Sequence, residues 1–232
     1  MNNSFIIIGL DSWESACSTD VGRLTKALSR GSRVLYAEPP SGGECAPSKG
    51  DKPRGRPMQS VRPMIRQLSE RLILFSPPVV LWRADYFPRG VVRDTIVRIN
   101  SLRYSESIAW AVSTVGMGEF AVITDNAAAL SPALLAALGG TAALYYLSCS
   151  PMNVPLLRTV DAVVATSSRL IDAARNYNIN SFDIGEGINP QNGRRKSTNW
   201  NKSAQRIEAI LRMLKTEERV FGNEREKEKM FN

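Results

Sequence analysis

Histidine is absent from the 232 residues of this chain. Its absence excludes imidazole bases, Ser-His-Asp triads and histidine metal ligands, so that acid–base chemistry falls to Asp, Glu, Lys, Tyr or Cys. The three cysteines, Cys17, Cys45 and Cys149, show no CxxC spacing. We therefore expect neither a disulfide framework nor a bound metal, and a reducing, cytoplasmic setting.

Long apolar runs are also scarce. Residues 5–10 (FIIIGL) are too few, and lack the basic leader, for a signal peptide. The uncharged stretch 126–150 is interrupted by Pro132 and by Gly139-Gly140, whereas a spanning helix needs about 20 unbroken apolar residues. A transmembrane segment is thus the less favoured interpretation of this stretch.

Positive charge is in excess, with a net charge of +8. Lysine and arginine concentrate in the Pro- and Gly-rich stretch 49–71 and in the C-terminal tail. An exposed basic loop can simply be solvated, or it can contact an acidic membrane surface or a lipid-linked pyrophosphate. Nucleic acid is not an expected partner, because no aromatic residues alternate with the basic ones.

Apolar runs that alternate with helical patterns predict an α/β fold, a doubly wound and mostly parallel sheet with a C-terminal helix packing back on it. We expect about six or seven strands. A short helix is predicted at 64–68 and a long one at 91–115. The strands are expected at 5–10, 33–37, 72–75, 120–124, 144–147 and 162–165, with another ending in the glycines near 185.

The periodic pattern stops after Asn189. Residues 1–189 are predicted to form one Rossmann-like domain, and the polar segment 190–199 (PQNGRRKSTN) a linker. A helix is expected over 200–218, where Ile207, Ile210, Leu211 and Leu214 form an apolar stripe. Residues 219–232 form a charged tail.

Polar residues just past the strand ends are the candidate ligand contacts, because ligands of open α/β sheets bind at the carboxyl ends of the strands. Asp11 is the candidate catalytic base, with bonding to loop amides as the alternative. The candidate binding residues are Trp13, Glu38, Asp125, Asn126, Thr166, Ser167 and Glu186.

Each of the other candidates also has a structural alternative. Trp13 can stack on a sugar ring or pack under its loop, and Thr166 or Ser167 can be a helix cap. Asp125-Asn126 directly follows an apolar strand, which favours a functional interpretation. No GxGxxG follows the first strand, so that no dinucleotide cofactor is expected.

Four segments occur in an order that resembles a known family. They read SRVLYAEPP, LILFSPP, VDAVVATSSRLIDAARNYN and IGEGIN. Together they look like the amino-terminal, acceptor-binding domain of bacterial glycosyltransferases of the GT-B fold, family 4 or 1. The likeness covers residues 4–190, and the helix from Trp200 resembles the last helix of such enzymes.

The resemblance implies a role in bacterial cell-surface polysaccharide synthesis. A sugar would pass from a nucleotide-sugar donor to a saccharide or lipid-linked acceptor, near the inner face of the membrane. The segment 190–199 stands where the family has its donor-binding domain, so we expect turnover only with a partner chain. The alternative is a non-enzymatic acceptor-binding or scaffold module, acting as a homo- or hetero-oligomer with another transferase.

Overall fold

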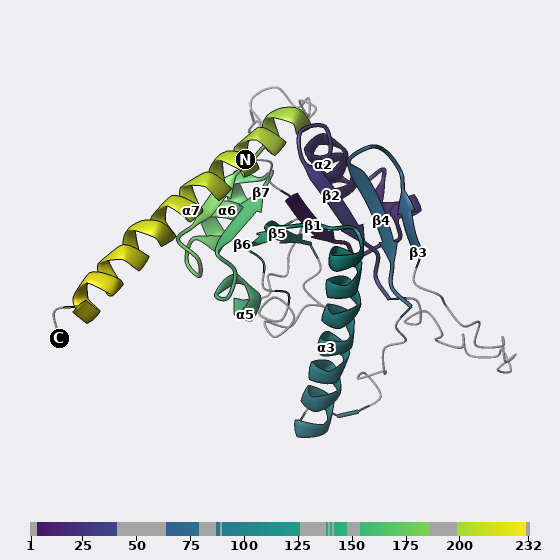
Figure 1. Cartoon of the computed structure of the whole chain (residues 1–232), viewed down its shortest axis with the longest axis horizontal. Coiled ribbons are helices and arrows are strands. Elements are labelled where there is room, and N and C mark those ends of the chain that lie inside the picture. The colour runs from purple at the N-terminus through teal and green to yellow at the C-terminus, as the bar shows by residue number, and fades with distance from the viewer. Residues whose placement is uncertain are drawn as a thin grey trace, which may run out of the picture.

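The computed structural model describes residues 4–40, 64–78, 87–88, 90–125, 138, 140, 142–147, 154–185 and 199–230, with side chains described as far as residue 216. This part of the chain forms an α/β, Rossmann-like fold of eight strands and six helices (Figure 1). The strands are β1 (Ser4–Ile8), β2 (Arg33–Ala37), β3 (Met64–Gln67), β4 (Leu72–Ser76), β5 (Phe120–Thr124), β6 (Ala142–Tyr146), β7 (Ala162–Ala165) and β8 (Ser181–Asp183). The helices are α1 (Trp13–Ala16), α2 (Asp20–Leu28), α3 (Val91–Thr114), α5 (Val154–Leu157), α6 (Ser168–Ala174) and α7 (Trp200–Met230).

All strands belong to one sheet with the order β3-β4-β2-β1-β5-β6-β7-β8. Every neighbouring pair is parallel except β3 with β4. The predicted α/β class and mostly parallel sheet are therefore confirmed. The helix predicted at 64–68 is wrong, because Met64–Gln67 is the antiparallel edge strand β3.

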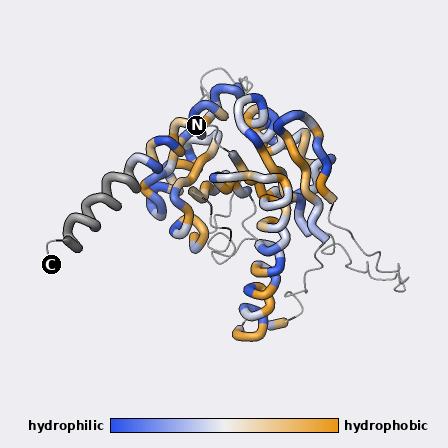
Figure 2. The backbone as a smooth tube through the Cα atoms, in the orientation of Figure 1, coloured by the Kyte–Doolittle hydropathy of each residue, from blue (hydrophilic) through white to orange (hydrophobic). Residues whose placement is uncertain are grey.

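Successive residues along a strand pack on opposite faces of the sheet. Phe5 and Ile7 of β1 belong to one buried cluster together with residues of α2 and α7, whereas Ile6 and Ile8 belong to a second cluster with residues of α3. A third cluster joins β6 and β7 to α5 and α6. Because both faces are covered, the inner strands β1, β2, β4, β5, β6 and β7 are mostly apolar and buried (Figure 2).

Helix α7 begins beside α2 (Figure 1) and contributes five side chains to the first cluster, namely Ala204, Ile207, Ile210, Leu211 and Leu214. Polar contacts accompany them, since Ser32 donates to Glu208 over 2.9 Å and Arg30 to Asn201 over 2.7 Å. The helix continues to Met230 rather than ending at 218. The predicted linker 190–199 lies outside the described residues except for Asn199.

None of the helices in the described part of the chain is both long enough and apolar enough to cross a membrane. The uncharged stretch 126–150 lies largely outside those residues, apart from Leu138, Gly140, β6 and Leu147. Leu138 and Leu147 are both buried in the core.

Replacing Ile207 by alanine tests how strongly α7 supports the sheet. Ile207 is fully buried in the first cluster, so the truncation leaves a cavity and should lower the free energy of unfolding by about 2–5 kcal/mol. Met213→Ala, on the exposed side of the same helix, should change it by less than about 0.5 kcal/mol. Urea denaturation of both variants measures the difference, and equal effects would show that α7 adds no core packing.

Candidate functional site at the β1–β5 boundary

The site is positioned by a reversal of strand order. From β1 the chain moves outward to β2 and β4, and after α3 it returns to form β5 on the opposite side of β1. Open α/β sheets bind ligands outside the carboxyl ends of the strands at such a reversal. Asp11 follows β1 and Asp125 directly follows β5, so two of the predicted site residues flank this boundary.

Asp125 is a buried carboxyl group at this boundary. Burial raises its pKa to about 6, with the nearby Asp11 charge adding to the rise, while backbone N–H groups of Asp125 itself and Leu10 act in the opposite direction. Its Oδ1 atom is buried and has no hydrogen-bond partner among the described residues. A carboxyl group with a pKa near 6 can accept a proton at neutral pH, as a general base must.

Tyr36 links β2 to the loop that carries Asp11. Its hydroxyl donates to the backbone carbonyl of Asp11 over 2.9 Å. To reach it, the ring crosses Gly9 so closely that a Cβ atom there would lie 1.9 Å from the hydroxyl oxygen. Burial raises the pKa of Tyr36 above its usual range, and the charges of Asp125, Asp11 and Glu38 raise it further, so that the hydroxyl remains a donor.

Glu38 and Trp13 hold the helix α1 in place. The two carboxylate oxygens of Glu38 accept hydrogen bonds from the Trp13 backbone N–H, over 2.8 Å, and from the Ser76 hydroxyl. The Trp13 ring packs edge-on against Tyr36 at a centroid distance of 5.1 Å, and Lys26 Nζ lies 5.6 Å from its centroid. These contacts of both residues are internal to the protein and position the Asp11 loop.

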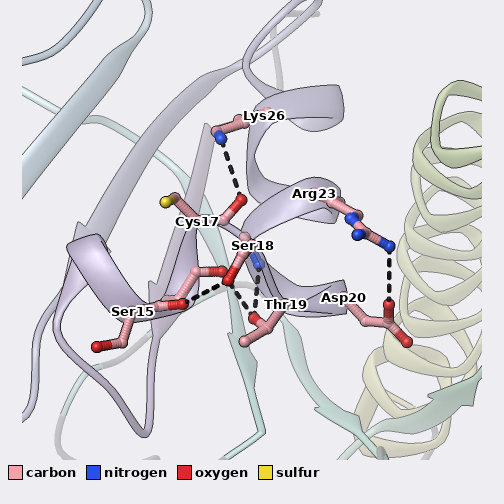
Figure 3. Close-up of polar contacts among 9 residues, drawn as sticks. Ser15, Cys17, Ser18, Thr19, Asp20, Arg23 and Lys26 are labelled. Atoms are coloured by element: carbon pink, nitrogen blue, oxygen red, sulfur yellow. Dashed lines mark hydrogen bonds and ion pairs between the residues drawn. The ribbon is translucent and has the colours of Figure 1, made fainter.

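The turn between α1 and α2 is a network of short polar contacts (Figure 3). Lys26 donates to the carbonyl of Cys17 over 3.1 Å, and Ser18 to the carbonyl of Ser15 over 3.1 Å. Thr19 is the N-cap of α2 and accepts from the Gly22 N–H, and Asp20 is the first helical residue. Asp20 pairs with Arg23 over 3.8 Å.

The remaining candidates lie farther along the edge or outside the described residues. Thr166 follows β7, and Ser167 is the N-cap of α6, although its side chain makes no capping hydrogen bond. Gly185, after β8, approaches Thr166 so closely that a Cβ would lie 2.7 Å from its carbonyl oxygen. Asn126 and Glu186 fall outside the described residues.

Tyr146 is a member of the site that the sequence analysis missed. The register pairs Thr124 with Tyr145, so Asp125 and Tyr146 come next at the same level of adjacent strands. The Tyr146 hydroxyl is buried without a hydrogen-bond partner in the described structure. Burial raises the pKa of Tyr146, and the charges of Asp20 and Asp125 raise it further. A weak polar interaction with the Thr166 side chain acts in the opposite direction, but it does not meet the geometry of a hydrogen bond. The sequence feature that could have identified Tyr146 is its place at the end of an apolar strand.

No metal-binding constellation accompanies these groups: within the described ranges, no three His, Cys, Asp or Glu side chains are placed to share an ion. No protein-family model and no curated protein matches this sequence. The arrangement at the β1–β5 boundary therefore has to be interpreted from its own chemistry.

Replacing Gly9 by alanine tests whether the Tyr36 crossing holds the site together. The added methyl group would collide with the Tyr36 hydroxyl, so we expect the unfolding free energy to fall by about 1–3 kcal/mol. Gly118→Ala is the matched control, since a Cβ there meets no atom within 4 Å. Thermal unfolding compares the two, and a Gly9 variant as stable as the control would mean that Tyr36 moves aside without cost.

Asp125→Asn tests the raised pKa through the pH dependence of stability. A carboxyl pKa that is higher in the folded than in the unfolded chain favours folding at low pH, and this contribution is lost as the pH rises from about 4 through about 6. Relative to Asp125→Asn, the parent should lose about 2–3 kcal/mol between pH 4 and pH 7. Urea denaturation across that range measures the loss, and parallel curves for parent and variant would contradict it.

Proposed function

We propose that this chain is the acceptor-binding lobe of a sugar transferase of the GT-B type. In this proposal the sheet is one doubly wound lobe and α7 is the helix that returns to it. The ordered segments that resemble such lobes support the assignment, as do the strand reversal at β1–β5 and the five α7 side chains in the core. The proposed setting is bacterial cell-surface polysaccharide synthesis.

The observation that carries the proposal is the buried Asp125 carboxyl at the strand reversal, with Asp11 beside it. In sugar transfer, an acceptor hydroxyl attacks the anomeric carbon while the bond to the leaving nucleoside diphosphate breaks. A carboxylate takes the proton of the attacking hydroxyl. Asp125, with a pKa of about 6, is ionised at neutral pH and suits this role, whereas Asp11 contributes the neighbouring charge.

The donor side is proposed to come from another chain. Between the end of β8 at Asp183 and the start of α7 at Trp200 the chain has 16 residues (200 − 183 − 1), far fewer than a second Rossmann domain needs. Nucleotide sugar would thus be used only in a homo- or hetero-oligomer that supplies the donor site. The basic segment 49–71, of which only 64–71 are described, is proposed to contact the inner face of the membrane or a lipid-linked acceptor.

A non-enzymatic scaffold module is the second candidate, and the surface of α3 favours it. Val91, Val92 and Trp110 expose 82%, 58% and 47% of their surface on this helix. Val91 and Val92 are adjacent at the start of α3, whereas Trp110 lies about five turns farther along the helix. Contiguous exposed apolar surface, as at the first pair, is often covered by a partner protein. The two candidates share a saccharide-binding edge and differ in whether turnover occurs when the partner is present.

Ligand titrations followed by backbone NMR test the acceptor-lobe proposal. We expect oligosaccharides to shift resonances near β1 and β5, and UDP or GDP to leave them unchanged, because the acceptor lobe does not hold the donor nucleotide. The purified chain alone should neither hydrolyse UDP-glucose nor transfer glucose from it to an acceptor. Asp125→Asn should abolish the saccharide shifts, while the exposed Asp172→Asn on α6 retains them. Nucleoside diphosphate binding at this edge, or turnover by the chain alone, would refute the proposal.

A further inference from the structure

Two buried polar atoms without partners lie on adjacent strands at the proposed site. They are the Oδ1 atom of Asp125 and the hydroxyl oxygen of Tyr146, the only two such side-chain atoms found among the described residues. Tyr146 itself is 1% exposed. The two residues occupy the same level of β5 and β6, and the Asp125 charge acts on the Tyr146 hydroxyl. Both unpartnered atoms therefore belong to one place in the fold.

Leaving such atoms unpaired is costly. A buried donor or acceptor without a partner destabilises the folded state by about 1–3 kcal/mol. Phenylalanine would fill the space of Tyr146 without that penalty, so the hydroxyl does not serve the stability of the fold. Most buried polar side-chain atoms in native proteins are paired, and an exception at a strand reversal points to a group that arrives from outside.

The charges around the pair select the kind of group. Two carboxylates, Asp20 and Asp125, raise the pKa of the Tyr146 hydroxyl. The neighbouring Tyr36 hydroxyl is likewise affected by Asp125, Asp11 and Glu38. The nearby described cations are already engaged, since Arg23 pairs with Asp20 and Lys26 donates to the Cys17 carbonyl. Arg206 donates to the Gly185 carbonyl beside β8, three strands from β5. Among the described residues, the charges that act on these two hydroxyls are therefore carboxylates, which repel an anionic ligand group.

We propose that Tyr146 and Asp125 together hold one uncharged hydroxyl group of the ligand. A hydroxyl can donate to the Asp125 carboxylate and accept from the Tyr146 O–H at the same time. A phosphate or carboxylate oxygen would be repelled by Asp125, and an ammonium group could not accept from the tyrosine. This assignment rests on the proposed function and narrows it: the acceptor presents a neutral sugar hydroxyl at the β5–β6 edge, and Tyr146 is the specificity residue.

The first test separates a ligand-binding hydroxyl from a structural one. Tyr146→Phe should leave the midpoint of thermal unfolding unchanged or raise it, because it removes a buried unpaired donor. Asp125→Asn should likewise not lower the midpoint at pH 7. A fall of several degrees in Tyr146→Phe would identify the hydroxyl as part of the structural hydrogen bonding and would overturn the assignment.

The second test measures ligand class by NMR titration. The probes are the methyl glycosides of glucose, galactose and mannose, each compared with its uronic acid. At least one neutral glycoside should bind, and its uronate should bind at least about tenfold more weakly. Tyr146→Phe should weaken neutral binding by about 2–10-fold, whereas Tyr145→Phe, which faces the opposite side of the same strand, should not.

Tighter binding of the uronates, equal binding by Tyr146→Phe, or no binding of any neutral glycoside would overturn the assignment. Uronate preference would still leave the acceptor-lobe proposal standing, since a saccharide would occupy the edge. Binding of UDP or GDP in place of saccharides would instead remove the proposed function.

Discussion

The pairing of β1 with both β2 and β5 is the constraint on which the rest of the structure depends. The central strand has neighbours on either side, reached by chain segments that run in opposite directions across the sheet. Side chains at the starts of the segments that follow β1 and β5 can therefore meet at this strand reversal. Asp11 and Asp125 occupy these starts. Burial raises the pKa of Asp125, and the charge of Asp11 raises it further.

Burial on both faces confines polar chemistry to the strand ends. The strands alternate between clusters that include α2 and α7 on one face and α3 on the other, which leaves little room for a charged side chain within the sheet. At Gly9 the absence of a side chain leaves room for the Tyr36 ring, which reaches from β2 across the end of β1 to the Asp11 loop. A ring from a buried strand thus fixes a loop at the edge.

Much of the sheet could be predicted because its strands are buried runs. The strand Phe120–Thr124 and the helix from Val91 lie where the pattern indicated. The strand Met64–Gln67 could not be recognised, since three of its four residues are exposed and it lacks the apolar alternation of a core strand. Its pairing with β4 is set by a tertiary contact, which a local pattern does not contain.

The candidate site divides in a similar way. Asp11 and Asp125 were predictable because each follows an apolar strand, a relation that is local in sequence. Tyr146 was not, since its importance depends on the register that sets it level with Asp125 on a neighbouring strand. The contacts of the Glu38 carboxylate are likewise non-local, because Trp13 and Ser76, which donate to it, come from two other segments of the chain.

The edge combines two kinds of polar side chain with different physical consequences. Glu38 and Tyr36 are paired within the protein and so lower the energy of one arrangement of the α1 loop. Asp125 and Tyr146 each leave a buried atom unpaired and so raise the energy of the folded state without a ligand. Paired residues (Glu38 and Tyr36) thus surround two unpaired ones (Asp125 and Tyr146). This arrangement is expected where a bound ligand, rather than the folded chain itself, completes the last hydrogen bonds. The same reasoning explains why substitutions of the paired residues should lower stability, while those of Asp125 and Tyr146 should lower affinity without lowering stability at neutral pH.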